Sequence, residues 1–278
     1  MKQPFLMAGL IGWPVAHSRS PAIHNYWLKH YGISGAYGLF PVTPGSLTNA
    51  INGLKALGLA GCNVTLPHKV EAMKLMDYVD PVAKKMGAIN TIVHTLDGAL
   101  HGFNHDGNGY IQSLRDANAL WRADTGPVTL LGAGGAARAV VLSLLNEGAQ
   151  EIRLVNRTKD KALVLAEEMG PKVVVVDWND RHDALDQAVL LINTTSLGMQ
   201  GKEVLELNLS KLPERALVSD AIYIPLETEL LKAARLRGHT TVNGLGMLLN
   251  QARFGFNAWF GVSPEITPEL HQAVLATF

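Results

Sequence analysis

The sequence predicts an α/β protein built of two domains. Its 278 residues exceed the usual size of one compact domain, so the length alone favours two. Short apolar runs alternate with helix-like segments from the start of the chain, and this alternation begins again near residue 107. A glycine-rich turn between an apolar run and a helical pattern follows this second start. We expect residues 1–106, completed by 239–278, to form one domain, and residues 107–238 to form the other.

Five apolar runs in the first domain are expected to form a mostly parallel sheet with helices on its faces. The predicted strands are Leu6–Ile11, Ala36–Val42, Gly58–Val64, Ala88–His94 and Ala99–Phe103. One helix is predicted from Ser20 to about His30, with Ser20 as its cap and Pro21 in its first turn. A second helix is predicted over Gly45–Leu57.

The second domain is predicted to begin with a helix, Gly109–Ala117. The strand and helix that flank the glycine turn follow, at Pro127–Leu131 and Ala136–Leu145. Further strands are predicted at Ile152–Val155, Val173–Asp177, Val189–Asn193 and Ala216–Asp220. Two C-terminal helices, Leu248–Phe260 and Pro268–Ala276, are expected to return to the first domain. The first has an apolar face at helical spacing, made by Leu248, Ala252, Phe256 and Trp259.

Composition and charge exclude several classes of protein. Lys+Arg and Asp+Glu are equal at 24 each, so the chain lacks the excess of basic residues that would indicate a nucleic-acid partner. The N-terminal apolar stretch is short and interrupted, and no run approaches the roughly 20 apolar residues of a membrane span. The single cysteine, Cys62, fits a reducing compartment, and no metal-ligand pattern is present. We expect a soluble cytoplasmic protein with a small-molecule substrate, no metal, and a monomeric or homodimeric state.

The glycine turn predicts a dinucleotide-binding domain of the Rossmann type. Backbone N–H groups of such a turn, at the start of a helix, can meet a pyrophosphate. The residues of the turn are Gly132, Ala133, Gly134, Gly135 and Ala136. The loop after a later strand carries Thr195, which is expected to contact the cofactor. For the glycine turn, the alternative is a turn that binds no nucleotide. For the loop that carries Thr195, the alternative is a polar loop without cofactor contact.

The motif Asn156-Arg157-Thr158 predicts which dinucleotide is bound. It ends the strand Ile152–Val155 and lies 24 residues after Gly132, where an NAD-binding fold usually places an acidic residue. Arginine here favours a 2′-phosphate over a free hydroxyl. NADP is therefore the expected cofactor, and NAD is less favoured.

Polar segments accompany several predicted strand ends of the first domain. They are His17–Pro21, Asn63–Lys69, Asn90-Thr91 and Asn104–Asp106. Because the carboxyl ends of parallel strands share one edge of a sheet, we expect these groups to converge, where they suit a small polyhydroxylated acid. Lys69 and Asp106 are the candidate catalytic pair, since a lysine beside an aspartate can deliver a proton to a carbonyl oxygen during hydride transfer. The alternative is a surface ion pair or two unrelated charges.

Six motifs, in chain order, resemble those of the shikimate dehydrogenase family. They are His17–Pro21, Asn63–Lys69, Gly87–Thr91, the Gly132 turn, Asn156–Thr158 and Gly244–Gln251. The resemblance extends over essentially the whole chain. It implies a substrate-binding N-terminal domain and the NADP-linked interconversion of shikimate and 3-dehydroshikimate.

The resemblance also implies roles for the matched substrate-domain positions. Ser18 and Ser20 would hold the substrate carboxylate. Thr65, Asn90 and Gln251 would bind ring hydroxyls, and the candidate catalytic pair would keep its role.

On the cofactor side, the resemblance implies that Asn156, Arg157 and Thr158 bind the adenosine 2′-phosphate, with Lys161 at the rim. The remaining implied positions line the nicotinamide or substrate side of a cleft: Ala221, Tyr223 and Gly244, with Tyr223 assigned to the substrate.

One departure from the family pattern leaves the substrate open. The segment before the catalytic aspartate is usually Asn-Thr-Asp, whereas here it is Asn104-His105-Asp106. His105 is expected either to face solvent or to reshape the substrate pocket. A dehydrogenase for quinate or a related acid is therefore an alternative. An NAD preference and a nucleotide-sensing protein without turnover are two further alternatives.

Overall fold

The computed structural model describes residues 4–278, which divide into two compact units. Residues up to His105 join Leu249–Phe278 in the first unit, and Asp106–Leu248 form the second. Helix α9, Gly244–Phe260, begins in the second unit and ends in the first. The expected boundary after residue 238 falls too early, because strand β12, Thr241–Val242, pairs with β11 in the sheet of the second unit.

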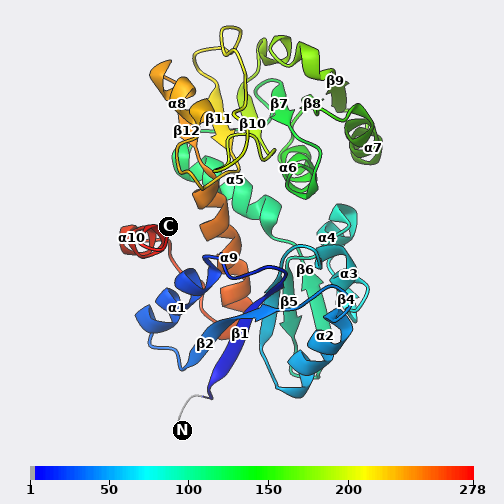
Figure 1. Cartoon of the computed structure of the whole chain (residues 1–278), viewed down its shortest axis with the longest axis vertical. Helices are drawn as coiled ribbons and strands as arrows, with labels where there is room; N and C mark the ends of the chain where they lie inside the picture. Colours follow the sequence, from blue (N-terminus) through cyan, green and yellow to red (C-terminus); the bar gives the residue numbers. More distant parts are fainter. Residues whose placement is uncertain (1–3) are drawn as a thin grey trace. The chain divides into compact units, whose positions relative to one another are not determined.

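The first unit contains a six-stranded sheet in the order β2-β1-β3-β5-β6-β4 (Figure 1). Its strands are β1 Leu6–Gly12, β2 Gly35–Pro41, β3 Gly61–Val64, β4 Tyr78–Val79, β5 Thr91–His94 and β6 Leu100–Phe103. β1 runs parallel to β2 and β3, and β4 runs parallel to β6. β5 is antiparallel to both β3 and β6, so the sheet is mostly parallel with one reversed strand.

Five helices of the first unit accompany this sheet, besides the larger part of α9. They are α1 Ser20–His30, α2 Leu47–Ala56, α3 Lys69–Met73, α4 Pro81–Met86 and α10 Pro268–Leu275. The N-cap of α1 is Arg19, so the prediction that Ser20 caps this helix is wrong. The indole of Trp27 on α1 donates to the Glu265 carbonyl at 2.9 Å, which fixes the segment before α10 within this unit as expected.

The second unit contains a six-stranded, fully parallel sheet in the order β12-β11-β10-β7-β8-β9. Its longer strands are β7 Val128–Leu131, β8 Ile152–Val155, β9 Val173–Val176, β10 Leu190–Asn193 and β11 Leu217–Asp220. The strand order reverses between β7 and β10. In open parallel sheets, ligands bind beside the carboxyl ends of the strands at this switch point.

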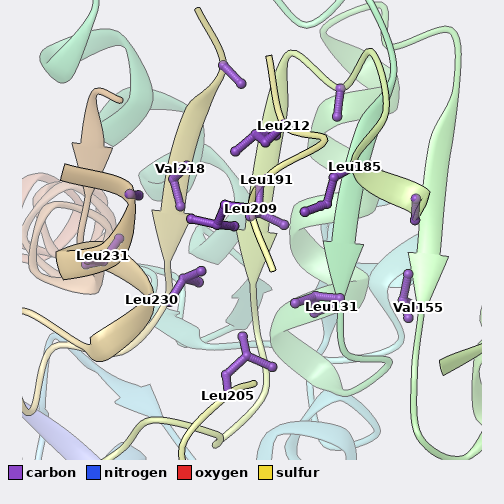
Figure 2. Packing of buried hydrophobic residues seen from close by; sticks show 14 of the residues in the cluster. Leu131, Val155, Leu185, Leu191, Leu205, Leu209, Leu212, Val218, Leu230 and Leu231 are labelled. Atoms are coloured by element: carbon purple, nitrogen blue, oxygen red, sulfur yellow. The ribbon is translucent and has the colours of Figure 1, made fainter. Parts of the chain in front are cut away.

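Helices α5 Asp106–Ala117, α6 Gly135–Asn146, α7 Lys159–Met169 and α8 Glu229–Leu236 complete the second unit. Two short 3₁₀ turns, Trp178–Asp180 and Asp183–Leu185, follow β9. Leucine and valine side chains from β7, β8, β10, β11 and α8 form one buried cluster (Figure 2). Parallel strands covered on both faces bury nearly every side chain, which explains their continuous apolar sequences. Among the described residues, no helix is both long and apolar enough to cross a membrane.

Candidate active site

The register of the first sheet brings the ends of three strands to one edge. Thr91, the first residue of β5, pairs with Asn63 near the end of β3 and with Phe103 at the end of β6. Asn90 therefore precedes a strand and does not follow one. It reaches the expected edge because β5 is antiparallel to its neighbours, so its amino end lies beside their carboxyl ends.

The two serines at the start of α1 are linked to each other. The Ser18 hydroxyl donates to Ser20 Oγ at 3.2 Å and accepts from the Ser20 backbone N–H at 3.2 Å. Ser20 is 7% exposed, whereas Ser18 is half-buried. Two neighbouring hydroxyls near a helix N-terminus form a suitable environment for a carboxylate.

Lys69 is the first residue of α3, and its backbone is tied to the Asn90 segment. The Ile89 N–H donates to the Lys69 carbonyl at 3.0 Å. The preceding residue, His68, is buried, and its Nε2–H donates to the Val42 carbonyl at 2.7 Å. These two bonds hold the turn that carries the lysine.

Thr65 lies in this same turn, close to the end of β1. Its N–H donates to the Ile11 carbonyl at 2.9 Å. A Cβ at Gly12 would approach Thr65 Cγ2 to 2.3 Å, so only glycine permits this contact. The turn therefore depends on the end of β1 for its position.

The side-chain amide of Asn90 is oriented by two donors. Its Oδ1 accepts from the Thr91 hydroxyl at 2.8 Å and from the His105 N–H at 3.1 Å. Because the oxygen accepts both bonds, the orientation of the amide is fixed. Asn90 itself is 3% exposed.

Gln251 lies on α9, which is anchored to the first sheet. The Trp259 indole donates to the Ile92 carbonyl at 2.9 Å, and a Cβ at Gly61 would meet that indole at 2.3 Å. Ala252, Phe256 and Trp259 are buried as predicted, whereas Leu248 is half-buried.

His105 does not simply face solvent. Its ring stacks on Phe254 of α9 at 4.5 Å between centroids and 9° between planes. It also stacks on Phe103, at 5.8 Å between centroids and 12° between planes. Its backbone N–H fixes Asn90, so the residue is tied to the predicted substrate side through its main chain.

In the second unit, the glycine turn lies at the switch point of the sheet. Gly132 has φ +113°, and a Cβ there would meet Thr194 Oγ1 at 2.5 Å. The same Thr194 hydroxyl donates to the Leu131 carbonyl at 2.7 Å, which closes β7 against the loop after β10. A Cβ at Gly134 or Gly135 would meet no atom within 4 Å, so the start of α6 is open for close approach of a ligand.

The Asn156-Arg157-Thr158 motif lies between β8 and α7. Asn156 Nδ2 donates to the Thr158 carbonyl at 2.8 Å, which shapes the turn. The Arg157 side chain is 60% exposed and pairs with Glu203 at 3.4 Å. Both line a cavity of about 440 Å³, together with Trp178 and Arg181. Lys161 is exposed in the first turn of α7.

The loops after β10 and β11 are held by a buried aspartate. Asp220 accepts from Asn193 Nδ2 at 3.1 Å and from the Thr228 hydroxyl at 2.8 Å. Burial raises the pKa of Asp220, while these hydrogen bonds oppose the rise. Thr195 donates its hydroxyl to Asn193 Oδ1 at 2.7 Å and accepts from the Leu197 N–H. The Thr195 hydroxyl therefore shapes its own loop, and its contact with a cofactor stays a prediction.

Ala221 and Gly244 are brought together as the motifs imply. The Gly244 N–H donates to the Ile222 carbonyl at 2.9 Å, and a Cβ at Gly244 would meet the Ala221 carbonyl at 2.1 Å. Tyr223 follows directly in this loop.

Asp106 is the first residue of α5, and α5 packs tightly on α6. A Cβ at Gly107 would meet the Ala139 carbonyl at 2.8 Å. The helix pair therefore fixes the backbone of Asp106 within the second unit. No cluster of three or more metal-ligating side chains occurs within residues 4–278.

Tyr37 and Asp220 have structural roles at these edges that the sequence does not predict, and for Asn63 and His68 it predicts the location, in the polar segment Asn63–Lys69, but not the partners. The Tyr37 hydroxyl donates to Asn63 Oδ1 at 2.7 Å, and Asn63 Nδ2 donates to Thr91 Oγ1 at 3.3 Å. The buried, apolar context of Asn63 and Asp220 at strand ends is a usable signal, because polar groups in such places need partners. Tyr37 and His68 carry no comparable signal in the sequence.

The all-parallel sheet with an open glycine turn at its switch point defines a dinucleotide-binding domain. The first unit adds hydroxyl, amide and ammonium groups at one sheet edge. Together these features define the class of dehydrogenases that use a nicotinamide dinucleotide.

Comparisons with known proteins identify the family. Residues 10–92 match the shikimate dehydrogenase substrate binding domain, and residues 117–220 match the shikimate / quinate 5-dehydrogenase family. A shikimate dehydrogenase (NADP(+)) from Paramagnetospirillum magneticum is 48% identical over 97% of this chain and 98% of that protein. The chain belongs to the shikimate dehydrogenase family.

Two solved structures show the range of that family. The shikimate 5-dehydrogenase from Thermus thermophilus, in complex with NADP(H) and shikimate, has a TM-score of 0.86 and 33% identity. That match covers 98% of this chain and all of the other (100%). The quinate dehydrogenase from Corynebacterium glutamicum, in complex with NAD, has a TM-score of 0.90 and 30% identity, covering 98% and 99% of the two chains.

Proposed function

We propose that this chain catalyses the reversible, NADP-linked interconversion of 3-dehydroshikimate and shikimate. The observation that carries the proposal is the convergence of Asn63, Asn90 and the Lys69 turn at one sheet edge. This convergence occurs in a chain that aligns over 97% of its length with an NADP(+) shikimate dehydrogenase.

Substrate binding is assigned to groups of defined polarity. Ser18 and Ser20 offer hydroxyl donors to the carboxylate. Thr65, Asn90 and Gln251 match the ring hydroxyls, and Tyr223 adds a further hydroxyl. The Asn90 amide is oriented by the two hydrogen bonds that its Oδ1 accepts.

Proton transfer is assigned to Lys69 and Asp106. When bound, NADPH supplies the hydride for reduction of the ring ketone. Lys69 Nζ donates a proton to the oxygen that becomes the new hydroxyl, and it accepts that proton in the reverse direction. The Asp106 carboxylate stabilises the ammonium form and orients the substrate hydroxyl.

Cofactor binding is assigned to the backbone of Gly132–Ala136 for the pyrophosphate, and to Asn156, Arg157, Thr158 and Lys161 for the 2′-phosphate. Thr195, Ala221 and Gly244 are assigned to the nicotinamide end. The open space at Gly134 and Gly135 supports the first assignment, and the exposed guanidinium of Arg157 supports the second.

A second candidate is activity on quinate, or with NAD. The specific observation that favours it is the similarity, at 30% identity, to a quinate dehydrogenase in complex with NAD. His105 stands where the family usually has threonine, and it contacts Asn90 through its backbone.

One assay separates these activities. The initial rate of reduced-nicotinamide absorbance change is measured with shikimate and with quinate, each against NADP and NAD. A kcat/KM that is highest for shikimate with NADP supports the proposal. A higher value for quinate or NAD would favour the second candidate, and cofactor binding without turnover on either acid would indicate a sensing protein.

A cytoplasmic location is also proposed. The single cysteine, Cys62, is buried and forms no disulfide, which fits a reducing compartment. Fractionation of the source cells with an antibody to the chain tests this location, and gel filtration decides between a monomer and a homodimer.

A further inference from the structure

The cavity beside Arg157 contains a second arginine, Arg181, to which the proposed function gives no role. Both side chains line this cavity of about 440 Å³ in the second unit, a volume within the roughly 300–1,000 Å³ of ordinary ligand pockets. The guanidinium group stays positively charged throughout the physiological pH range. Two arginines that line one cavity therefore favour an anionic ligand.

The register of the second sheet explains why the two arginines reach the same cavity. Val155, the last residue of β8, pairs with Val176, the last residue of β9. Because these strands are parallel, the loops that follow them leave the sheet at the same edge. The first of these loops carries Arg157, and the second carries Arg181.

The Arg181 guanidinium is held in place by three contacts. Its Nε donates to the Glu206 carbonyl at 3.1 Å, and its Nη1 donates to the Trp178 carbonyl at 3.0 Å. Its Cζ also lies 5.0 Å from the centroid of the Trp178 ring, which is a cation–π contact. An arginine has five N–H donors, so these bonds leave three of them for a ligand.

The charges around the cavity also distinguish the two arginines. Arg157 has a carboxylate partner, Glu203, at 3.4 Å. Within residues 4–278, Arg181 forms no ion pair, although Glu206 lines the same cavity. A guanidinium that is fixed by carbonyl oxygens and has no carboxylate partner can bind a phosphate with little loss of side-chain entropy.

We propose that Arg181 is a specificity-determining residue that binds the 2′-phosphate of NADP together with Arg157. Arg157 contributes an exposed side chain, whereas Arg181 contributes a fixed fork of N–H donors from the neighbouring loop. The inference rests on the proposed function, which assigns the 2′-phosphate to Arg157. It adds a residue that follows β9 and lies outside the motif Asn156–Thr158.

The test measures the dissociation constants of NADPH and NADH by the fluorescence of the reduced nicotinamide, without substrate. Arg181→Gln should weaken NADPH binding about tenfold, the scale of losing one charge-assisted hydrogen bond, and NADH binding by less than about twofold. A merely structural role would weaken the binding of both cofactors alike, because they differ only in the 2′-phosphate. Equal losses for the two cofactors would therefore overturn the proposal.

Arg153→Gln is the matched control for the loss of a guanidinium. The Arg153 side chain also donates to a backbone carbonyl of the same unit, that of Ala184 at 3.1 Å, but it pairs with Glu151 and is not among the residues that line the cavity. This variant should change the ratio of the two dissociation constants by less than about twofold. A ratio that changes as much in Arg153→Gln as in Arg181→Gln would assign the effect to overall charge and overturn the proposal.

Arg157→Gln, measured in the same way, separates this inference from the proposed function. If Arg157→Gln lowers the preference for NADPH and Arg181→Gln does not, the inference about Arg181 fails alone. If neither variant changes the preference, this cavity does not bind the 2′-phosphate, and the proposed role of Arg157 fails with the inference.

A second variant covers the case in which Arg181→Gln folds poorly. Arg181→Lys keeps the positive charge but loses the planar fork that bonds two carbonyls and stacks on Trp178. It should weaken NADPH binding about threefold and leave NADH binding nearly unchanged. Thermal unfolding identifies the temperature at which each variant is folded for titration. An Arg181→Lys enzyme that binds NADPH as tightly as the unmodified enzyme would overturn the proposal that a fixed guanidinium binds the phosphate.

Discussion

The two units present ligand-binding groups in opposite ways. In the first, the polar side chains at the sheet edge are mostly buried and bonded to each other before any ligand binds, as Ser20, Asn63 and Asn90 show. In the second, the glycine turn is open and the Arg157 side chain is 60% exposed. A small acid is recognised by a few directional bonds that must be fixed in advance. A long dinucleotide can instead be held by backbone N–H groups and by an exposed, positively charged side chain that binds its phosphate.

The largest expected effect tests the first unit. Lys69→Ala should lower kcat about a thousandfold while KM for shikimate changes little, because a proton-transferring group acts in the transition state. Steady-state kinetics in both directions measure this split. Lys74→Ala, an exposed lysine just after α3, is the matched control and should behave as the unmodified enzyme. A Lys69→Ala enzyme with normal kcat would remove the lysine from the mechanism.

The next effect tests the glycine turn of the second unit. Gly132→Ala should lower the free energy of unfolding by about 3 kcal/mol, since it places a side chain at φ +113° and 2.5 Å from Thr194 Oγ1. Gly134 has φ −92° and open space, so Gly134→Ala should fold normally yet weaken NADPH binding by crowding the pyrophosphate. Urea unfolding and a fluorescence titration with NADPH separate the two outcomes. Equal stability of both variants would contradict the strain argument.

The contrast between the units also explains what the sequence could predict. The strand Ile152–Val155 is predicted to the residue, because a buried parallel strand is a continuous apolar run with clear ends. The reversed direction of β5 could not be predicted, because short apolar runs do not reveal whether neighbours are parallel. The strand-end argument places Asn90 at the observed edge, but it assumes that Asn90 follows a parallel strand, whereas Asn90 precedes the antiparallel strand β5.

Side-chain partners were the least predictable part of the site. Ser20 has the sequence context of a helix cap, yet the cap position is Arg19 and the Ser20 hydroxyl accepts from the Ser18 hydroxyl. α9 begins at Gly244, a turn earlier than its apolar pattern suggests. Glycine normally disfavours a helix, but the Ala221 carbonyl leaves no room for a Cβ at this position. Such choices depend on segments far away in the chain, which periodicity does not report.

A moderate effect tests the charge at the cofactor end. Arg157→Gln should raise KM for NADPH about thirtyfold and leave KM for NADH nearly unchanged, because only the first carries a 2′-phosphate for the guanidinium to bind. Each cofactor therefore serves as the control for the other in one variant. Equal losses for NADPH and NADH would show that Arg157 supports the fold of the turn and does not read the phosphate.

The smallest effect concerns the partner of that arginine. Glu203 pairs with Arg157 at 3.4 Å through a side chain that is 80% exposed, so it competes with an incoming 2′-phosphate for the same guanidinium. Glu203→Gln should lower KM for NADPH by up to about threefold, and the gain should shrink in high salt, since exposed ion pairs are weak and screened. Glu206→Gln is the matched control: Glu206 lines the same cavity, but its hydrogen bond with Arg181 uses its backbone carbonyl. An equal gain from Glu206→Gln would assign the effect to overall charge, whereas a gain confined to Glu203→Gln would show that the exposed arginine is restrained before cofactor binds.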